Sequence, residues 1–246
     1  MKNNIQFFNK NLIIFKVSMI DKLSVEKTTG ISIYIQIISL IASSVGISYK
    51  LPAEHLIITD LLVLETIVQF IELVFYLTFL KNMSKTVTGM AKTRYYDWFI
   101  TTPTMLLTTI VYFEYLHRLE TNGAPFRFVD FIKENQRNII FITIANFLML
   151  LFGYLYEIGK INKKSAALLG YIFFLVTFGF IYNNYAQKSE MGKKIFVLLF
   201  IIWGLYGIAF MLSDIAKNNL INFLDLFAKN FFGIFLFYEA HRLSSI

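Results

Sequence analysis

Residues 222–238 read NFLDLFAKNFFGIFLFY, an apolar run with a single lysine near its centre. A charged side chain in the middle of a bilayer costs at least about 2.5–3.5 kcal/mol, so Lys229 requires a partner or a function. Asp225 precedes it by four residues and lies on the same face of a helix, where its carboxylate can offset the charge. A buried lysine amine is also a good Schiff-base nucleophile. From this spacing alone, a structural ion pair and a reactive lysine both remain open.

Six further apolar runs precede this one and are also long enough to cross a membrane. The predicted spans cover residues 30–49, 56–80, 95–116, 139–158, 166–185, 195–212 and 220–240. The 246-residue chain is 57% apolar and 16% charged, whereas soluble proteins contain about 25% charged residues. The connectors are short and polar. We therefore predict an all-α membrane protein in which a seven-transmembrane-helix bundle occupies residues 30–246.

The composition argues against several classes of function. Cysteine is absent, which excludes disulfides, thiolate metal sites and cysteine nucleophiles. No phosphate-binding glycine loop, Ser–His–Asp arrangement or metal-ligand cluster occurs, so we expect neither an enzyme nor a metal site. The net charge of +7 comes mostly from residues between the apolar runs, which favours lipid head groups over nucleic acid as partners. Lysine and arginine are divided almost evenly between the two sets of connectors, so the positive-inside rule assigns no orientation.

The first 29 residues differ from the rest of the chain. They mix lysine with phenylalanine and isoleucine at loosely helical spacing. Lys10 and Lys16 interrupt the apolar patch, and no A-x-A-like cleavage site follows, which argues against a signal peptide. We predict that residues 1–29 form an N-terminal amphipathic segment at the membrane interface.

The third predicted span begins with RYYDWFITTP at Arg94. Arg94 and Asp97 are three residues apart, so both can face the interior of the bundle. Thr101 follows Asp97 by one turn and can hydrogen-bond its carboxylate. Trp98 and Thr102 share a neighbouring face, which suits a flat apolar ligand. Each residue alone has an ordinary core explanation, but together with a buried lysine they indicate a site.

Two sequence strings resemble the motifs of a known protein family. R-Y-x-D-W-x-x-T-T-P in the third span and D-x-x-x-K in the seventh resemble the strongest signatures of the microbial (type 1) rhodopsins, and the chain looks most like the group 1 viral rhodopsins. The resemblance covers roughly residues 30–243. It implies a bundle of the microbial rhodopsin type and all-trans retinal bound to Lys229 as a Schiff base. Asp97 and Asp225 resemble the two counterions, with Arg94 beneath them.

The resemblance also implies a retinal pocket. The matching positions are Trp98, Thr101, Thr102, Met105, Asn146, Met149, Gly153, Trp203, Tyr206 and Phe210. Two positions depart from the family pattern, because Gly207 replaces the usual proline of the sixth span and Phe210 replaces a usual tryptophan. These departures predict a looser pocket at the ring end of retinal.

The groups that would move protons differ from those of a fast pump. An outward proton pump needs an acceptor, a donor and a release group, all of them titratable. Asp97 is the acceptor implied by the resemblance. The donor position, eleven residues later, holds Thr108, which cannot supply a proton at neutral pH. A pump built in this way would cycle slowly.

Two polar stripes instead favour an ion pathway. Glu65 and Glu72 are seven residues apart on one helical face, with Gln69 between them. Asn218 and Asn222 form a similar stripe that leads toward the lysine of the seventh span. Carboxylates along a narrow pore favour cations. The alternative is that the two glutamates bond neighbouring helices or remain protonated.

These features together predict a retinal-binding photoreceptor that acts as a light-gated channel for monovalent cations. The alternatives are a slow outward proton pump and a sensory rhodopsin that acts through a separate partner. The expected location is the lipid bilayer, as a multi-pass protein, in a membrane of a virus-infected host cell; the Ile-, Asn- and Lys-rich composition would suit an AT-rich viral genome. No motif decides between a monomer and a homo-oligomer.

Overall fold

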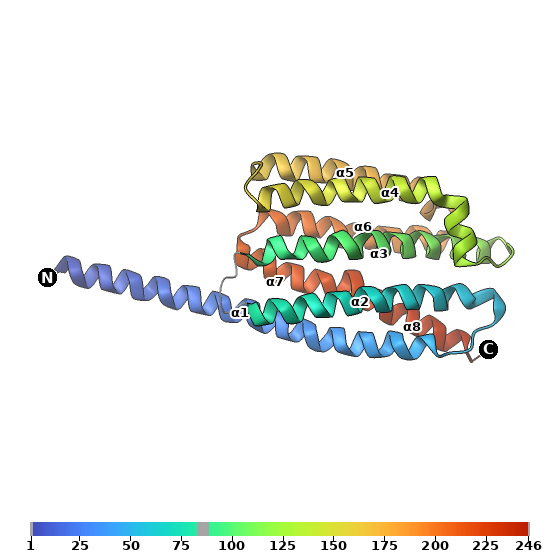
Figure 1. The fold of residues 1–246 in the computed structure, drawn as a ribbon, viewed down its shortest axis with the longest axis horizontal. Helices are drawn as coiled ribbons and strands as arrows, with labels where there is room; N and C mark the ends of the chain where they lie inside the picture. The colour runs from blue at the N-terminus through green and yellow to red at the C-terminus, as the bar shows by residue number, and fades with distance from the viewer. Residues whose placement is uncertain (1, 83–88, 246) are drawn as a thin grey trace.

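The computed structural model describes residues 2–82 and 89–245, with side chains described from Ser24 onward, and is almost entirely helical (Figure 1). Within these residues, six helices and one composite helix form the bundle. The bounds are α1 Lys2–Ile47, α2 Leu56–Asn82, α3 Met90–Glu120, α4 Phe128–Glu157, α5 Lys163–Asn184, α6 Glu190–Met211, and finally α7 Asp214–Asp225, the π-helical turn η3 Leu226–Asn230 and α8 Phe231–Leu243. Two short 3₁₀ turns, η1 Ala53–His55 and η2 Ala186–Lys188, lie in connectors. The predicted all-α seven-helix bundle is confirmed.

The helices extend beyond the predicted spans, because an apolar run marks the part of a helix that is in contact with lipid and polar residues continue it. α4 begins at Phe128 where the apolar run begins at 139, and α1 extends out of the bundle toward Lys2 (Figure 1). The amphipathic character predicted for residues 1–29 depends largely on side chains before Ser24, which lie outside those described, and it stays a prediction. The predicted connector at 81–89 also falls mostly outside the described residues.

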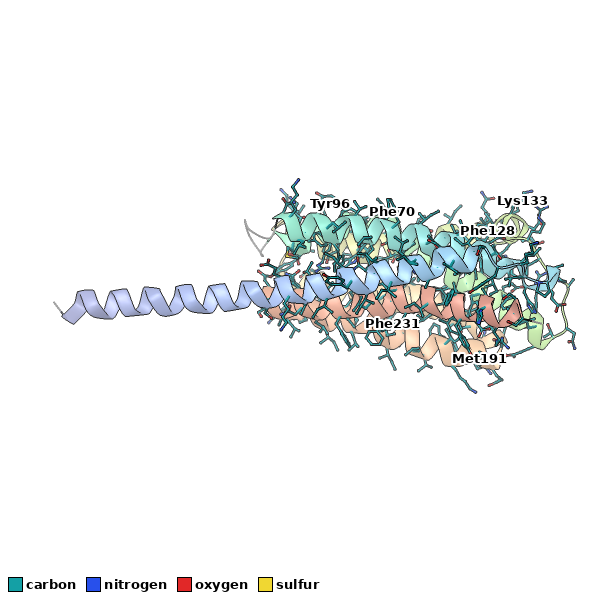
Figure 2. The ribbon with its side chains drawn as sticks, turned by 90° about the horizontal axis from the view of Figure 1, so that it is seen from below. Phe70, Tyr96, Phe128, Lys133, Met191 and Phe231 are labelled. Atoms are coloured by element: carbon teal, nitrogen blue, oxygen red, sulfur yellow. The ribbon has the colours of Figure 1, made fainter. Side chains whose placement is uncertain are left out.

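The outer surface of the bundle is apolar. Phe70, Tyr96 and Phe231 point away from the helices (Figure 2) and are 57%, 46% and 39% exposed. Five segments of the described chain are long and apolar enough to cross a membrane, namely Ser24–Ile47, Phe128–Glu157, Lys163–Lys188, Glu190–Met211 and Asp214–Leu243. α2 and α3 carry much of the buried charge described below. This surface is the one expected of a protein whose solvent is lipid.

The helices form a closed ring. α1 packs against α2 and against the composite last helix, α3 lies between α2 and α4, and α5 connects α4 to α6. Figure 1 shows α4 and α5 along one side of the bundle and α1, α2 and α8 along the other. Gly233 allows a close approach on this second side, because a Cβ atom there would overlap the side-chain amide of Gln69. The helices between these two sides carry the site.

Candidate functional site

Lys229 lies at the centre of a cluster of buried charges. Its Nζ atom is 2.7 Å from Asp97 Oδ2, 3.8 Å from Glu72 Oε1 and 4.0 Å from Asp225 Oδ1. All four side chains are at most 2% exposed. The lysine therefore faces carboxylates from α2, α3 and α7, and the nearest is Asp97 rather than its helical neighbour Asp225. Charges buried to this degree persist when they are paired, which explains how Lys229 is tolerated in the bundle.

The two aspartates have different surroundings. Asp225 accepts hydrogen bonds from the hydroxyls of Tyr76 (2.6 Å) and Tyr206 (2.7 Å) and from Arg94 Nη1 (3.3 Å). Asp97 accepts one from Lys229, and its Oδ1 atom has no partner among the described residues. Three donors, one of them the charged guanidinium, are therefore directed at Asp225, and charge-assisted bonds of this kind are strong. Asp97 keeps a free oxygen beside the lysine, which suits a group that takes up a proton.

Arg94 connects this cluster to the beginning of the last helix. Its Nε atom donates to Asn218 Oδ1 at 3.2 Å, and Nη2 donates to Asn222 Oδ1. The guanidinium carbon also lies 5.0 Å from the ring centre of Phe79, a cation–π arrangement. The two asparagines predicted for an ion pathway thus hold Arg94 in place in this state.

A polar face on α1 completes the cluster, and the predicted site residues did not include it. Asn222 Nδ2 donates to the hydroxyls of Thr28 (2.9 Å) and Thr29 (3.0 Å). Fully or almost fully buried polar side chains follow along the helix at Thr29, Ser32, Gln36, Ser39 and Ser43. Their alternating spacing of three and four residues is visible in the sequence, and it would have predicted this face.

The α2 stripe faces inward, as its spacing predicted. Glu65, Gln69 and Glu72 are all 0% exposed. Glu65 Oε1 accepts a hydrogen bond of 2.5 Å from Thr108, and Gln69 Nε2 donates to Ser43 Oγ at 3.2 Å. Both carboxyl oxygens of Glu72 lack a hydrogen-bond partner among the described residues. The threonine at the donor position therefore has a carboxyl group beside it, which the spacing within α3 could not reveal.

The threonines of α3 bond to the helix backbone. Thr101 Oγ1 donates to the carbonyl oxygen of Asp97 at 3.0 Å, and Thr102 Oγ1 donates to that of Trp98 at 2.7 Å. This is the usual bond of a helical threonine to the residue four positions earlier. Thr102 Oγ1 also accepts from Asn146 Nδ2 at 2.7 Å and so joins α3 to α4.

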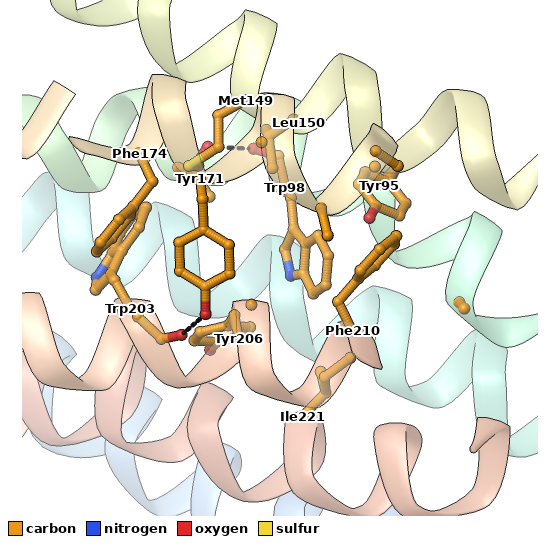
Figure 3. Close-up of a pocket in the computed structure, with 18 of the residues that line it drawn as sticks. Tyr95, Trp98, Met149, Leu150, Tyr171, Phe174, Trp203, Tyr206, Phe210 and Ile221 are labelled. Atoms are coloured by element: carbon orange, nitrogen blue, oxygen red, sulfur yellow. Dashed lines mark hydrogen bonds between the residues drawn. The ribbon is translucent and has the colours of Figure 1, made fainter. Parts of the chain in front are cut away.

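A single cavity brings most of the predicted pocket residues together with Lys229. They are Trp98, Thr102, Met105, Met149, Gly153, Trp203, Tyr206 and Phe210, whereas Thr101 and Asn146 lie outside its lining. Figure 3 shows aromatic side chains arranged along it, with Trp203 and Phe174 at one end. The prediction omitted several lining residues, mainly small or aromatic ones, such as Ala91, Tyr95, Ala167, Gly170 and Tyr171.

The space left by Gly207 is occupied by a tyrosine from α5. A Cβ atom at position 207 would overlap the Tyr171 ring. The Tyr171 hydroxyl donates to the carbonyl oxygen of Gly204 at 3.1 Å (dashed in Figure 3). The exchange of the usual proline for glycine therefore allows a phenol ring to enter the wall of the cavity.

The cavity and the amine together fit covalently held retinal. Retinal is a long apolar aldehyde, and it requires an amine within an apolar, aromatic-lined cavity and a carboxylate near the resulting charge. Lys229 is the amine that lines the cavity, Trp98 and Trp203 contribute large flat walls, and Asp97 lies 2.7 Å from the nitrogen. The residues present meet each requirement.

Comparison with known proteins gives an independent result. The family model for bacteriorhodopsin-like proteins matches residues 27–243. The solved structure of viral rhodopsin OLPVRII is 25% identical over 89% of this chain and 98% of that one, with a TM-score of 0.75. Xanthorhodopsin, described as a light-driven ion pump with dual chromophore, is 17% identical, covers 92% and 95%, and has a TM-score of 0.69. Halorhodopsin, a light-driven chloride pump, is 15% identical, covers 91% and 98%, and has a TM-score of 0.67. A search of curated protein sequences gives no match.

Proposed function

We propose that this chain, which belongs to the bacteriorhodopsin-like protein family, is a light-gated cation channel. In this proposal all-trans retinal is bound to Lys229. Family membership implies a retinal chromophore, and together with the apolar helices it makes the chain an integral multi-pass membrane protein. We further propose that this membrane belongs to a virus-infected host cell.

Bound retinal would supply light absorption and a change of shape at Lys229. The surrounding side chains then determine where the proton on Nζ goes. Asp97 Oδ2 is 2.7 Å away and has few competing partners, so it accepts that proton. Asp225, bonded to Tyr76 and Tyr206, keeps its charge. Loss of the Asp97 charge changes the field on Arg94, which joins α3 to the last helix.

One observation carries the channel proposal. Glu72 is fully buried 3.8 Å from Lys229 Nζ, and neither of its carboxyl oxygens has a hydrogen-bond partner among the described residues. Gln36, Gln69 and Asn230 carry further buried side-chain atoms of this kind. Buried polar atoms without protein partners are normally satisfied by water or an ion. A hydrated path along α1, α2 and the last helix would satisfy them, and its carboxylates favour cations.

The test is voltage-clamp recording of light-evoked current from cells that express the chain and are supplied with all-trans retinal. A channel gives a current that reverses sign near the cation equilibrium potential, and the reversal shifts when external sodium is replaced by a large organic cation. Small outward current at every voltage would contradict the channel. Silence from a coloured, surface-expressed protein would favour a sensor.

A slow outward proton pump is the second candidate, and the Glu65–Thr108 bond of 2.5 Å favours it. This bond places a carboxyl group beside the position from which reprotonation of Lys229 would be expected. If the chain pumps, Glu65→Gln should slow recovery of the pigment after a flash, and added azide, a small diffusible acid, should restore the rate. A channel with no need for that proton would recover at the same rate in both proteins.

A further inference from the structure

A second buried ion cluster lies where α4 ends and α7 begins. Lys217 Nζ is 2.9 Å from Glu157 Oε1 and 3.1 Å from Asp214 Oδ1. The side chains of Lys217 and Glu157 are 3% and 9% exposed, whereas Asp214 is half exposed. The pair of Lys217 and Glu157 is therefore largely removed from solvent, while Asp214 faces outward.

This pair belongs to the same cavity as Lys229. Glu157 and Lys217 both line it, as does Ile221, one helical turn after Lys217. Lys217 precedes Lys229 by twelve residues, which is about 18 Å along a helix. In Figure 3, Phe210 and Ile221 lie at the end of the cavity opposite Trp203. The two buried lysines therefore mark two different ends of one cavity.

We propose that the Glu157–Lys217 pair is a plug that closes this end of the cavity to water. The inference depends on the proposed function only in assigning the cavity to retinal. α4 packs mainly against α3 and α5, and α7 against α1 and α6, so the ion pair bridges two helices that have their main contacts elsewhere. A buried pair is stable when both partners are present and strongly unfavourable when one is removed. The plug is thus either closed and dry or open and hydrated.

A chain of hydrogen bonds connects the plug to the Lys229 cluster. Asn218, next to Lys217, accepts from Arg94 Nε at 3.2 Å and donates to the carbonyl oxygen of Asp214 at 2.8 Å. Arg94 in turn donates to Asp225 at 3.3 Å. A shift of Arg94 would therefore move the helical turn that carries Lys217 and Asp214. The access of water past the Glu157–Lys217 pair can therefore depend on the charge state of the Lys229 cluster.

Cysteine accessibility tests the plug directly, because the natural chain has no cysteine. Ile221 lines the cavity one turn inward of Lys217 and is 3% exposed, so Ile221→Cys places a single thiol behind the plug. The purified full chain, supplied with retinal, is treated with a charged methanethiosulfonate reagent, and labelling is followed by mass spectrometry. Adding Lys217→Met should speed labelling by about tenfold or more, since it leaves Glu157 buried without its partner. Lys217→Arg, which keeps the charge, should label as slowly as the parent.

A matched control is the Lys193–Glu190 pair, whose N–O distance is 2.6 Å but whose side chains are 41% and 77% exposed. Lys193→Met should leave the labelling rate unchanged. Glu157→Gln should speed labelling as Lys217→Met does, and the double variant should add little, because the two act as one unit. Equal labelling of the parent and the Lys217→Met protein, or equal acceleration by Lys193→Met, would overturn the plug. The labelling reaction requires neither a coloured pigment nor a current. A colourless protein would therefore count against retinal binding, and its labelling rates would still test the plug.

Discussion

Two groups of helices, α1, α2 and α7 in one and α4 to α6 in the other, bury different kinds of side chain. On the side of α1, α2 and α7, the buried polar residues include Thr29, Ser32, Gln36, Ser39, Ser43, Glu65, Gln69, Glu72, Asn218 and Asn222. Among the described residues from α4 to α6, they are Asn146, Thr177 and Ser189. The first group holds most of the buried polar and charged side chains, and the interior of the second is largely apolar. Lys229 lies at the border, because its nitrogen faces the carboxylates and also lines the cavity.

The largest expected effect is at this border. Lys229→Ala should give a protein with no visible absorbance after addition of retinal, because Lys217, the other lysine that lines the cavity, is paired with Glu157 at its opposite end. The control is Lys217→Met, which removes the other lysine of the cavity and should leave the pigment coloured. Absorbance spectra of the two purified proteins decide the matter. Visible colour in Lys229→Ala would refute the attachment site.

The next effect concerns the polar side. Glu72→Gln and Glu65→Gln should each change cation conductance or selectivity by about fivefold, since a unit charge close to a pathway is worth at least about 1 kcal/mol. The colour should be kept. Light-evoked currents are compared with those of Glu54→Gln, whose side chain is 64% exposed and should have no effect. Parental currents from both buried variants would show that the stripe is structural.

The apolar side predicts an effect on stability instead. Gly153→Ala should destabilise the protein by about 1–3 kcal/mol, because its Cβ atom would overlap the Tyr95 hydroxyl in a packed wall. Gly179→Ala is the matched change, since nothing lies within 4 Å of its Cβ position and alanine favours the helix. Thermal unfolding in the same detergent measures both. If Gly153→Ala unfolds at the parental temperature, the wall is not tightly packed.

The smallest expected effect concerns the hydrogen bond that joins α5 to α6. Tyr171→Phe removes the hydroxyl that donates to Gly204 and should cost about 0.5–1.5 kcal/mol of stability, the net value of one hydrogen bond. The ring remains, so retinal should still bind and current should be unaffected. The same melting experiment reads the change. A loss as large as that of Gly153→Ala would mean that the hydroxyl has a role beyond this bond.

Sequence patterns predicted these two sides unequally. The apolar runs predicted the fold, because they are local in the sequence. The resemblance carried by the strings around Asp97 and Lys229 implied most of the residues that line the cavity. The hydrogen bonds from Tyr76 and Tyr206 to Asp225 could not be predicted, since they join residues of different helices. Lys217 falls between the predicted spans 195–212 and 220–240, where long side chains usually reach the membrane surface. Its burial depends on Glu157, sixty residues earlier in the chain.

The π-helical turn Leu226–Asn230 has a consequence for insertions and deletions. Its closing bond runs from the Phe231 amide to the Leu226 carbonyl, so the turn holds one residue more than an α-helical turn. The wider turn takes up this extra residue, so the part that carries Asp225 and α8 stay close to the phase of one continuous α-helix. Deleting a single residue within the turn should leave an ordinary α-helical turn with Gly233 still close to Gln69, whereas a deletion inside α8 would rotate every residue after it by about 100°. We expect a change in length to be better tolerated in this turn than in the α-helical turns beside it, provided that Lys229 is kept.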